Sequence, residues 1–145
     1  MSGLYLVAQL AGRTVAIDSG QVESVVDIGE VTAVPRTSAV VRGLAALRSR
    51  VVTVIDTRVA LGVPAQDAAH RAVIVHVDGH HYALLVDALE DVAPFALQPL
   101  ANGIALDPAW ASIARGLVER DGEPMLAIDL AALVPAAAAA AAVAA

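Results

Sequence analysis

The chain has 145 residues and a net charge of −6, with an isoelectric point near 5.0; this length fits one domain or two very small ones that share a core, and the acidic balance does not suggest a nucleic-acid-binding surface. All nine basic residues are arginine and there is no cysteine, which excludes lysine-based covalent catalysis, thiol nucleophiles, thiolate zinc sites and disulfides. No stretch approaches 18 uninterrupted apolar residues, so we expect no membrane span, and the first residues do not resemble a secretory signal.

Short apolar segments alternate with glycine or aspartate turns along most of the chain. An Asp-Gly pair between two apolar runs favours a β-hairpin, because type I′ turns need a positive φ at both central positions. Short strands at this spacing are typical of an all-β barrel or sandwich. Three hairpins are therefore predicted: residues 4–10 with 14–17 across Ala11-Gly12-Arg13, 72–77 with 82–86 across Asp78-Gly79, and 116–119 with 124–128 across Asp121-Gly122.

Two short helical pieces should interrupt the strands. Asp107 directly precedes Pro108, which is the order of an N-cap and a first helical residue. Asp56 begins the second piece, and Gly62 closes it. Both pieces are too short to form the scaffold, so the fold class remains all-β.

The two halves of the chain resemble one another. Arg42-Gly43-Leu44 recurs as Arg115-Gly116-Leu117, and Ile55-Asp56 recurs as Ile128-Asp129, in both cases 73 residues later. Chance similarity between valine-rich strands is one explanation. We favour two similar β-modules of about 65 to 70 residues that share a hydrophobic seam, since each alone would have a marginal core.

The polar residues do not form a catalytic set. His76, His80 and His81 flank the Asp78-Gly79 turn, and a weak adventitious metal site that includes Asp78 is one interpretation of them. An exposed hairpin is favoured, because His80 and His81 should point to opposite faces of a strand and so should not converge on one ion. Four aspartates precede turns, which is the usual place of an Asx turn or a cap; they are Asp18, Asp56, Asp87 and Asp129. We therefore expect no enzyme activity, no metal and no cofactor.

Arg48 lies between an apolar run that starts at Gly43 and a strand rich in β-branched residues. A guanidinium is costly there unless it is paired internally or held at a surface for a partner. Pairing with Asp18 or Asp56 and contact with a partner protein both remain open, and arginine is enriched in interface hot spots. Arg42 and Arg50 are expected to be solvated.

This stretch resembles the signature of the CheW-like chemotaxis coupling proteins, apolar-x-Gly-apolar-x-Asn-Leu-Arg-Gly-x-apolar-apolar-Pro-apolar-apolar-Asp. Further matching pieces, in the same order, extend the resemblance from Leu4 to about Leu133. The chain departs from the pattern at Ala46, Ser49 and Thr53, where the family usually has Asn, Gly and Pro. The matching residues are Val41, Gly43, Leu44, Leu47, Arg48, Val51, Val52, Val54, Ile55 and Asp56.

The resemblance implies a single domain over residues 4–134, built from two intertwined five-stranded barrels of the Src-homology-3 type that pack on a shared core. The first barrel module is expected to span roughly residues 15–85. The second is expected to span roughly 86–134, with strands added from the N-terminal segment. Residues 135–145 are rich in alanine and are expected to be a dispensable extension, because alanine buries little area.

The resemblance also implies a function. Proteins of this family are non-catalytic cytoplasmic adaptors, recruited to membrane receptor arrays, that couple the cytoplasmic tips of chemoreceptors to the regulatory domain of a CheA-type histidine kinase. A module that binds a small ligand, or one that competes with the coupling protein, is the alternative. The implied receptor-facing surface lies near a groove between the modules, and Leu47, Arg48 and Ser49 would either line it or support it structurally. The implied kinase-facing residues belong to the first module and are Val31, Val34, Pro35, Val41 and Gly43.

Overall fold

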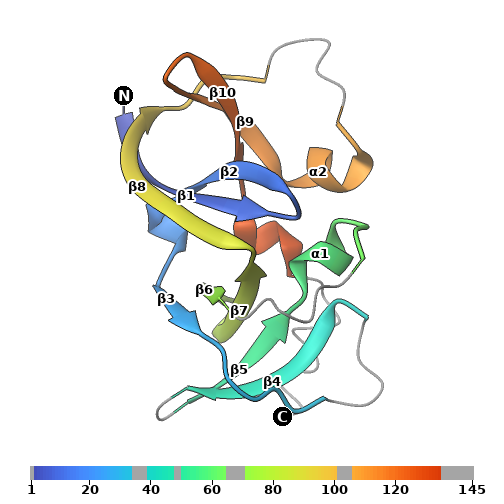
Figure 1. Cartoon of the computed structure of the whole chain (residues 1–145). Coiled ribbons are helices and arrows are strands. Elements are labelled where there is room, and N and C mark those ends of the chain that lie inside the picture. The colour runs from blue at the N-terminus through green and yellow to red at the C-terminus, as the bar shows by residue number, and fades with distance from the viewer. Residues whose placement is uncertain (1, 34–38, 48–49, 65–70, 101–105, 135–145) are drawn as a thin grey trace.

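The computed structural model describes residues 2–33, 39–47, 50–64, 71–100 and 106–134. It contains ten strands and four short helical segments (Figure 1). The elements in chain order are β1 (Ser2–Leu10), β2 (Arg13–Asp18), η1 (Ser19–Gln21), β3 (Ser24–Asp27), β4 (Val41–Leu47), β5 (Arg50–Ile55), α1 (Thr57–Ala60), β6 (Arg71–Val77), β7 (His80–Val86), β8 (Ala88–Ala96), α2 (Pro108–Ile113), β9 (Ala114–Arg120), β10 (Glu123–Ile128) and η2 (Leu130–Leu133).

The strands form two five-stranded sheets, one in the upper and one in the lower half of Figure 1. The first sheet has the order β8-β1-β2-β10-β9 and the second has the order β3-β6-β7-β5-β4. The two orders become identical when β1–β5 are matched in turn with β6–β10. The parallel pairs, β2 with β10 and β7 with β5, are equivalent in this matching. The topology thus confirms two similar β-modules.

Each sheet is built from both halves of the chain. The hairpin β1–β2 lies between β8 and the pair β10–β9, whereas the hairpin β6–β7 lies between β3 and the pair β5–β4. Each half therefore lends its first hairpin to the sheet that the other half completes. The two modules are therefore intertwined through this exchange of hairpins.

All three predicted hairpins are present, and each closes with a two-residue turn. The turn of the first hairpin is one residue shorter than predicted, because Arg13 pairs with Leu10. The turn residues have positive φ at both positions, for example +51° at Asp78 and +81° at Gly79. The same holds for Asp121-Gly122 and for Ala11-Gly12. Positive φ at both positions is the property of a type I′ turn, whose twist matches that of the strands it joins.

The prediction of closed barrels is wrong among the described residues, because the two edge strands of each sheet do not form a continuous ladder. A single residue pair links the edges of each sheet: Thr32 with Leu44 in one and Gln98 with Leu117 in the other. Regular pairing has already ended there, since β3 stops at Asp27 and β8 at Ala96. Each sheet therefore curls toward closure without completing it.

Two equivalent glycines permit these isolated pairs. Gly43 has a φ of +151°, and a Cβ at this position would collide with the carbonyl oxygen of Thr32. A Cβ at Gly116 would likewise collide with the carbonyl oxygen of Gln98. Glycine is required at both positions because only a residue without a side chain lets the backbones approach so closely.

The shared core predicted from the sequence lies between the two sheets. It includes Ile17 of the first sheet, Tyr82 and Ile55 of the second, and Trp110 and Leu130 from the helical segments. Each sheet also has a smaller apolar cluster of its own. The two modules are therefore joined by a common hydrophobic seam.

The two α-helices begin where the sequence predicted, whereas η1 and η2 were not predicted. The Oδ1 atom of Asp56 accepts a hydrogen bond from the backbone N–H of Val59 at 3.2 Å, which caps α1. Asp107 stands at the N-cap of α2, before Pro108, but its side chain makes no capping hydrogen bond. No helix in the part of the chain that the structure describes is long and apolar enough to span a membrane.

Candidate functional site

The repeated arginine and aspartate residues form two equivalent ion pairs. Arg42 Nη2 lies 2.8 Å from Asp56 Oδ2, and Arg115 Nη2 lies 3.0 Å from Asp129 Oδ2. Asp56 is buried, so an unpaired charge there would be costly. The expectation that Arg42 is solvated is therefore wrong. These pairs brace the ends of equivalent strands and are structural.

The gap between the unpaired edges of the second sheet forms a groove, which we call the β3–β4 groove. It has a volume of about 620 Å³. Ile74 of β6 contributes to its lining, while β3 and β4 supply the two sides. The groove is lined by Glu23, Ser24, Val25, Val26, Asp27, Ala46, Leu47, Arg50 and Ile74.

The β3–β4 groove combines apolar side chains with charged side chains at its rim. Val25, Val26 and Leu47 are half-buried and pack against the apolar clusters below them. At the rim, Arg50 Nη1 lies 3.4 Å from Glu23 Oε1, and both side chains are largely exposed. Exposed pairs of this kind contribute little stability. Their charges are therefore available to orient a partner that covers the apolar part.

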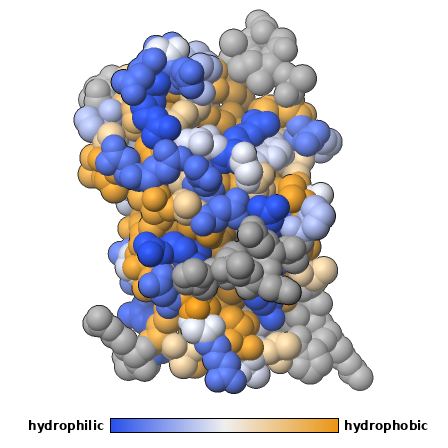
Figure 2. Space-filling model, viewed as in Figure 1, coloured by the Kyte–Doolittle hydropathy of each residue, from blue (hydrophilic) through white to orange (hydrophobic). Residues whose placement is uncertain are grey.

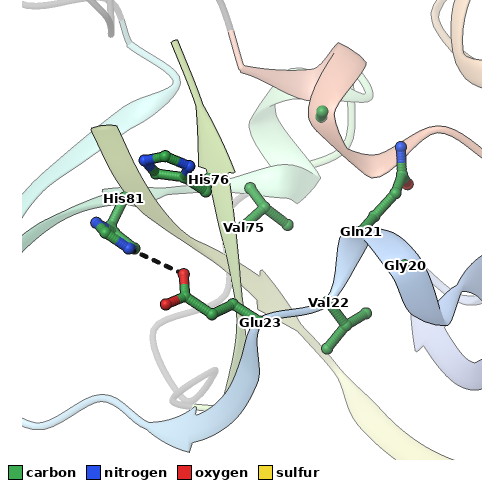
Figure 3. Close-up of a pocket in the computed structure, with 8 residues that line it drawn as sticks. Gly20, Gln21, Val22, Glu23, Val75, His76 and His81 are labelled. Carbon is green, nitrogen blue, oxygen red and sulfur yellow. Dashed lines mark ion pairs between the residues drawn. The ribbon is translucent and has the colours of Figure 1, made fainter. Parts of the chain in front are cut away.

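A second hollow adjoins this groove, and we call it the histidine hollow (Figure 3). Its volume is about 670 Å³. Glu23 lines both hollows, and its Oε2 atom lies 2.9 Å from His81 Nε2. The lining residues are Gly20, Gln21, Val22, Glu23, Val75, His76, His81 and Ala131.

The sequence carried an unused signal for this hollow. A two-residue turn at Asp78-Gly79 fixes the register of the hairpin, so that His76 stands directly opposite His81. His76 was named only as a residue that flanks the turn, and strand alternation was applied only to His80 and His81, which are neighbours on one strand. Counting back from the turn would have paired the two histidines.

Exposed apolar side chains lie on both modules. Val51 is 61% exposed at the start of β5, directly opposite Ala46 in the ladder. Leu4 and Val92 are exposed to a similar degree on the other sheet. Figure 2 shows apolar and hydrophilic residues side by side over one face of the molecule. Val51 extends the apolar surface beside the β3–β4 groove; it matches the family signature but was not predicted as a site residue.

Comparison with known proteins decides the family. The family profile described as "CheW-like domain" matches residues 4–138, which is most of the chain. This chain belongs to the CheW-like family.

A solved structure agrees with this assignment. The CheW-like chain is similar to the scaffolding protein TtCheW from Thermoanaerobacter tengcongensis, with a TM-score of 0.77 and 25% sequence identity. The similarity covers 92% of this chain and 93% of that one. None of the curated proteins compared matches the chain. CheW-like proteins are non-catalytic scaffolds, and the fold supports an adaptor role with protein partners in chemotaxis signalling.

The structure places the predicted receptor-facing residues only in part. Leu47, the last residue of β4, lines the β3–β4 groove. Arg48 and Ser49 lie outside the described residues. Arg48 is thus not assigned to either of its two roles, but the carboxylate of Asp56 is bound by Arg42.

The predicted kinase-facing residues divide in the same way. Val31 is half-buried and packs against the apolar cluster of the second sheet. Val41 is buried in the shared core, and Gly43 is buried against Thr32. Val34 and Pro35 lie outside the described residues. Of this set the structure brings Val31 and Gly43 close together, since Val31 Cγ1 lies where a side chain at Gly43 would be.

Proposed function

We propose that this CheW-like protein is a non-catalytic adaptor, working in the cytoplasm at receptor arrays. It couples chemoreceptor cytoplasmic tips to the regulatory domain of a CheA-type histidine kinase. The observation that carries the proposal is the family match over residues 4–138. The open groove beside the signature stretch supports it.

The β3–β4 groove is the proposed receptor contact. Leu47 lies at its edge, and Arg48 and Ser49 follow directly in the chain. A helical receptor tip could place an apolar stripe along the groove and polar residues against the charges of Glu23 and Arg50. Contacts of this kind, with a small apolar centre and a charged rim, suit reversible association.

The kinase contact is proposed on the same module, around Val31, Val34 and Pro35. Val41 and Gly43 belong to this set through their effect on shape, because both are buried. Gly43 lets the segment at Thr32 pack closely on β4, and this contact fixes the position of Val31. A change at Gly43 should therefore alter the surface without touching the partner.

The test replaces Leu47 with Asp, and Leu4→Asp serves as the matched control. Leu4 is an exposed leucine on the other sheet. We expect Leu47→Asp to weaken receptor binding at least tenfold, because a carboxylate would be desolvated in an apolar groove. Receptor-dependent kinase activation in a reconstituted array should fall with it, while Leu4→Asp retains both.

Two outcomes would overturn the proposal. Full receptor activation of the kinase by Leu47→Asp, with its folding confirmed by circular dichroism, would remove the groove as the receptor contact. Failure of the unmodified protein to bind both a kinase regulatory domain and a receptor fragment from the same cell would refute the adaptor function itself.

A further inference from the structure

One carboxylate links the histidine hollow to the β3–β4 groove. Glu23 Oε1 lies 3.4 Å from Arg50 Nη1, and Glu23 Oε2 lies 2.9 Å from His81 Nε2 (Figure 3). Glu23 stands just before β3, which forms one side of the groove. Arg50 begins β5 on the other side, opposite Leu47 of β4. The ion pair of Glu23 with Arg50 therefore joins the two sides of the groove, and we call it the strap.

The other module holds an equivalent glutamate. In the β1–β2 hairpin the second pair from the turn is Gln9 with Thr14, and Glu90 Oε2 accepts hydrogen bonds from both, at 3.2 and 3.4 Å. Glu90 Oε1 lies 3.1 Å from Arg120 Nη1 at the end of β9. One glutamate oxygen thus contacts the exchanged hairpin, and the other contacts an arginine from the far edge of the sheet.

The two modules differ in the groups that the hairpin offers to this glutamate. In the β6–β7 hairpin the second pair from the turn is His76 with His81, in place of an amide and a hydroxyl. An imidazole gains a proton between about pH 8 and 5, whereas an amide and a hydroxyl do not titrate there. The equivalent position to Thr14 is therefore sensitive to pH in the second module and insensitive in the first.

Few charged groups surround His81 among the described residues. Glu23 contacts it directly, and the ring of His76 is 4.7 Å away between centroids but makes no ion pair within the described ranges. Arg50 is the one charged residue of β5, the strand on the other side of β7. The other residues that line the hollow are uncharged: Gly20, Gln21, Val22, Val75 and Ala131. The remaining charged residues of β3, of β6 and of the turn after β6 are Asp27, Arg71 and Asp78, and the first two pair with one another.

A proton gained by His81 changes the balance at Glu23. The contact between the two side chains becomes an ion pair, so two cations then share one carboxylate. The attraction that holds Arg50 is weakened as a result. The strap is a weak link to begin with, because the side chains of Arg50 and Glu23 are 48% and 42% exposed. A small change in charge is therefore enough to release it.

We propose that protonation of His81 releases the Glu23–Arg50 strap, so that mildly acidic pH opens the β3–β4 groove to its partner. This inference rests on the proposed role of the groove as the receptor contact. The released guanidinium of Arg50 is then available to a carboxylate on the partner. The equivalent link in the first module stays closed over the same pH range, since hydrogen bonds from Gln9 and Arg120 hold the pKa of Glu90 below its ordinary 4.5.

Nuclear magnetic resonance of the uncomplexed protein tests the strap itself. Carbon-13 relaxation of the Arg50 side chain should show greater mobility at about pH 6 than at about pH 8, with the change following the titration of His81. His81→Thr copies Thr14 of the other module and should abolish this change. His80→Thr is the matched control, because His80 neighbours His81 but does not line the hollow. Constant mobility of Arg50 in the unmodified protein, or the same change in His81→Thr, overturns the proposal.

Calorimetric titration with a receptor cytoplasmic-tip fragment tests the effect on the groove. Binding should be about threefold tighter at about pH 6 than at about pH 8, as expected from the strength of an exposed ion pair. The ratio should fall to about one in His81→Thr and stay unchanged in His80→Thr. Tighter binding at the higher pH, or an unchanged ratio in His81→Thr, refutes control of the groove by His81. A fragment that binds at neither pH refutes the receptor contact, and the mobility of Arg50 still decides whether the strap exists.

Discussion

Removal of one buried hydroxyl should stabilise the protein. Tyr82 is fully buried in the shared core, and within the described ranges its hydroxyl has no hydrogen-bond partner. Burial also raises the pKa of this phenol, with a further contribution from the negative charge of Asp78. Both observations indicate a polar group that loses its contacts with water on folding and gains none in return.

The expected size of the effect follows from this environment. A buried hydroxyl without a partner costs about 1–3 kcal/mol, and Tyr82→Phe removes it while keeping the ring that fills the core. We therefore expect the free energy of unfolding to rise by about 1 kcal/mol. For a chain of this length that corresponds to a rise in Tm of about 2–4 °C.

Urea unfolding and calorimetry of Tyr82→Phe measure this change. Tyr5→Phe is the matched control, since Tyr5 is also buried but its hydroxyl is not among the orphaned groups. The control should be neutral or slightly destabilised. A loss of 1 kcal/mol or more in Tyr82→Phe would contradict the reasoning, because it would mean that the hydroxyl is satisfied.

Two further predictions concern the repeated elements. Gly43→Ala should lower the free energy of unfolding by about 2 kcal/mol or more, because the new Cβ meets the backbone of Thr32; Gly29→Ala, with open space around it, should be near neutral in the same urea titration. Burial raises the pKa of Asp129, but hydrogen bonds from Gln21 and Arg115 outweigh it and hold the pKa below its ordinary 3.8. Its stabilising effect, about 1 kcal/mol, is thus present above that value and lost as pH falls through the folded pKa. Unfolding of Asp129→Asn should therefore depend less on pH between about 5 and 2, and an unchanged slope would contradict the assignment.

Local features of the fold could be predicted from the sequence. Asp78-Gly79 and Asp121-Gly122 fixed two hairpins, because a two-residue turn determines both the twist and the register of its strands. The cap at Asp56 depends on neighbours in the chain and was also predictable. The 73-residue repeat showed that the modules would be similar.

Features that depend on distant contacts could not be predicted. Packing between the two halves decides which hairpin joins which sheet. The alternation of apolar and polar residues along a strand does not predict this choice. Closure of each sheet depends on the backbone at Thr32 or Gln98, beyond the regular strand. The β3–β4 groove exists because this closure is incomplete, so Leu47 is the one residue of its lining that was predicted as a site residue.

The trade of hairpins between the two halves links their folding. A chain cut between residues 64 and 71 would yield two pieces, each holding two strands of one sheet and three of the other. Neither piece could bury its apolar strand faces without the other piece. The two halves should therefore unfold together in one cooperative step. Once two duplicated halves have exchanged hairpins in this way, neither half can be deleted without loss of both sheets.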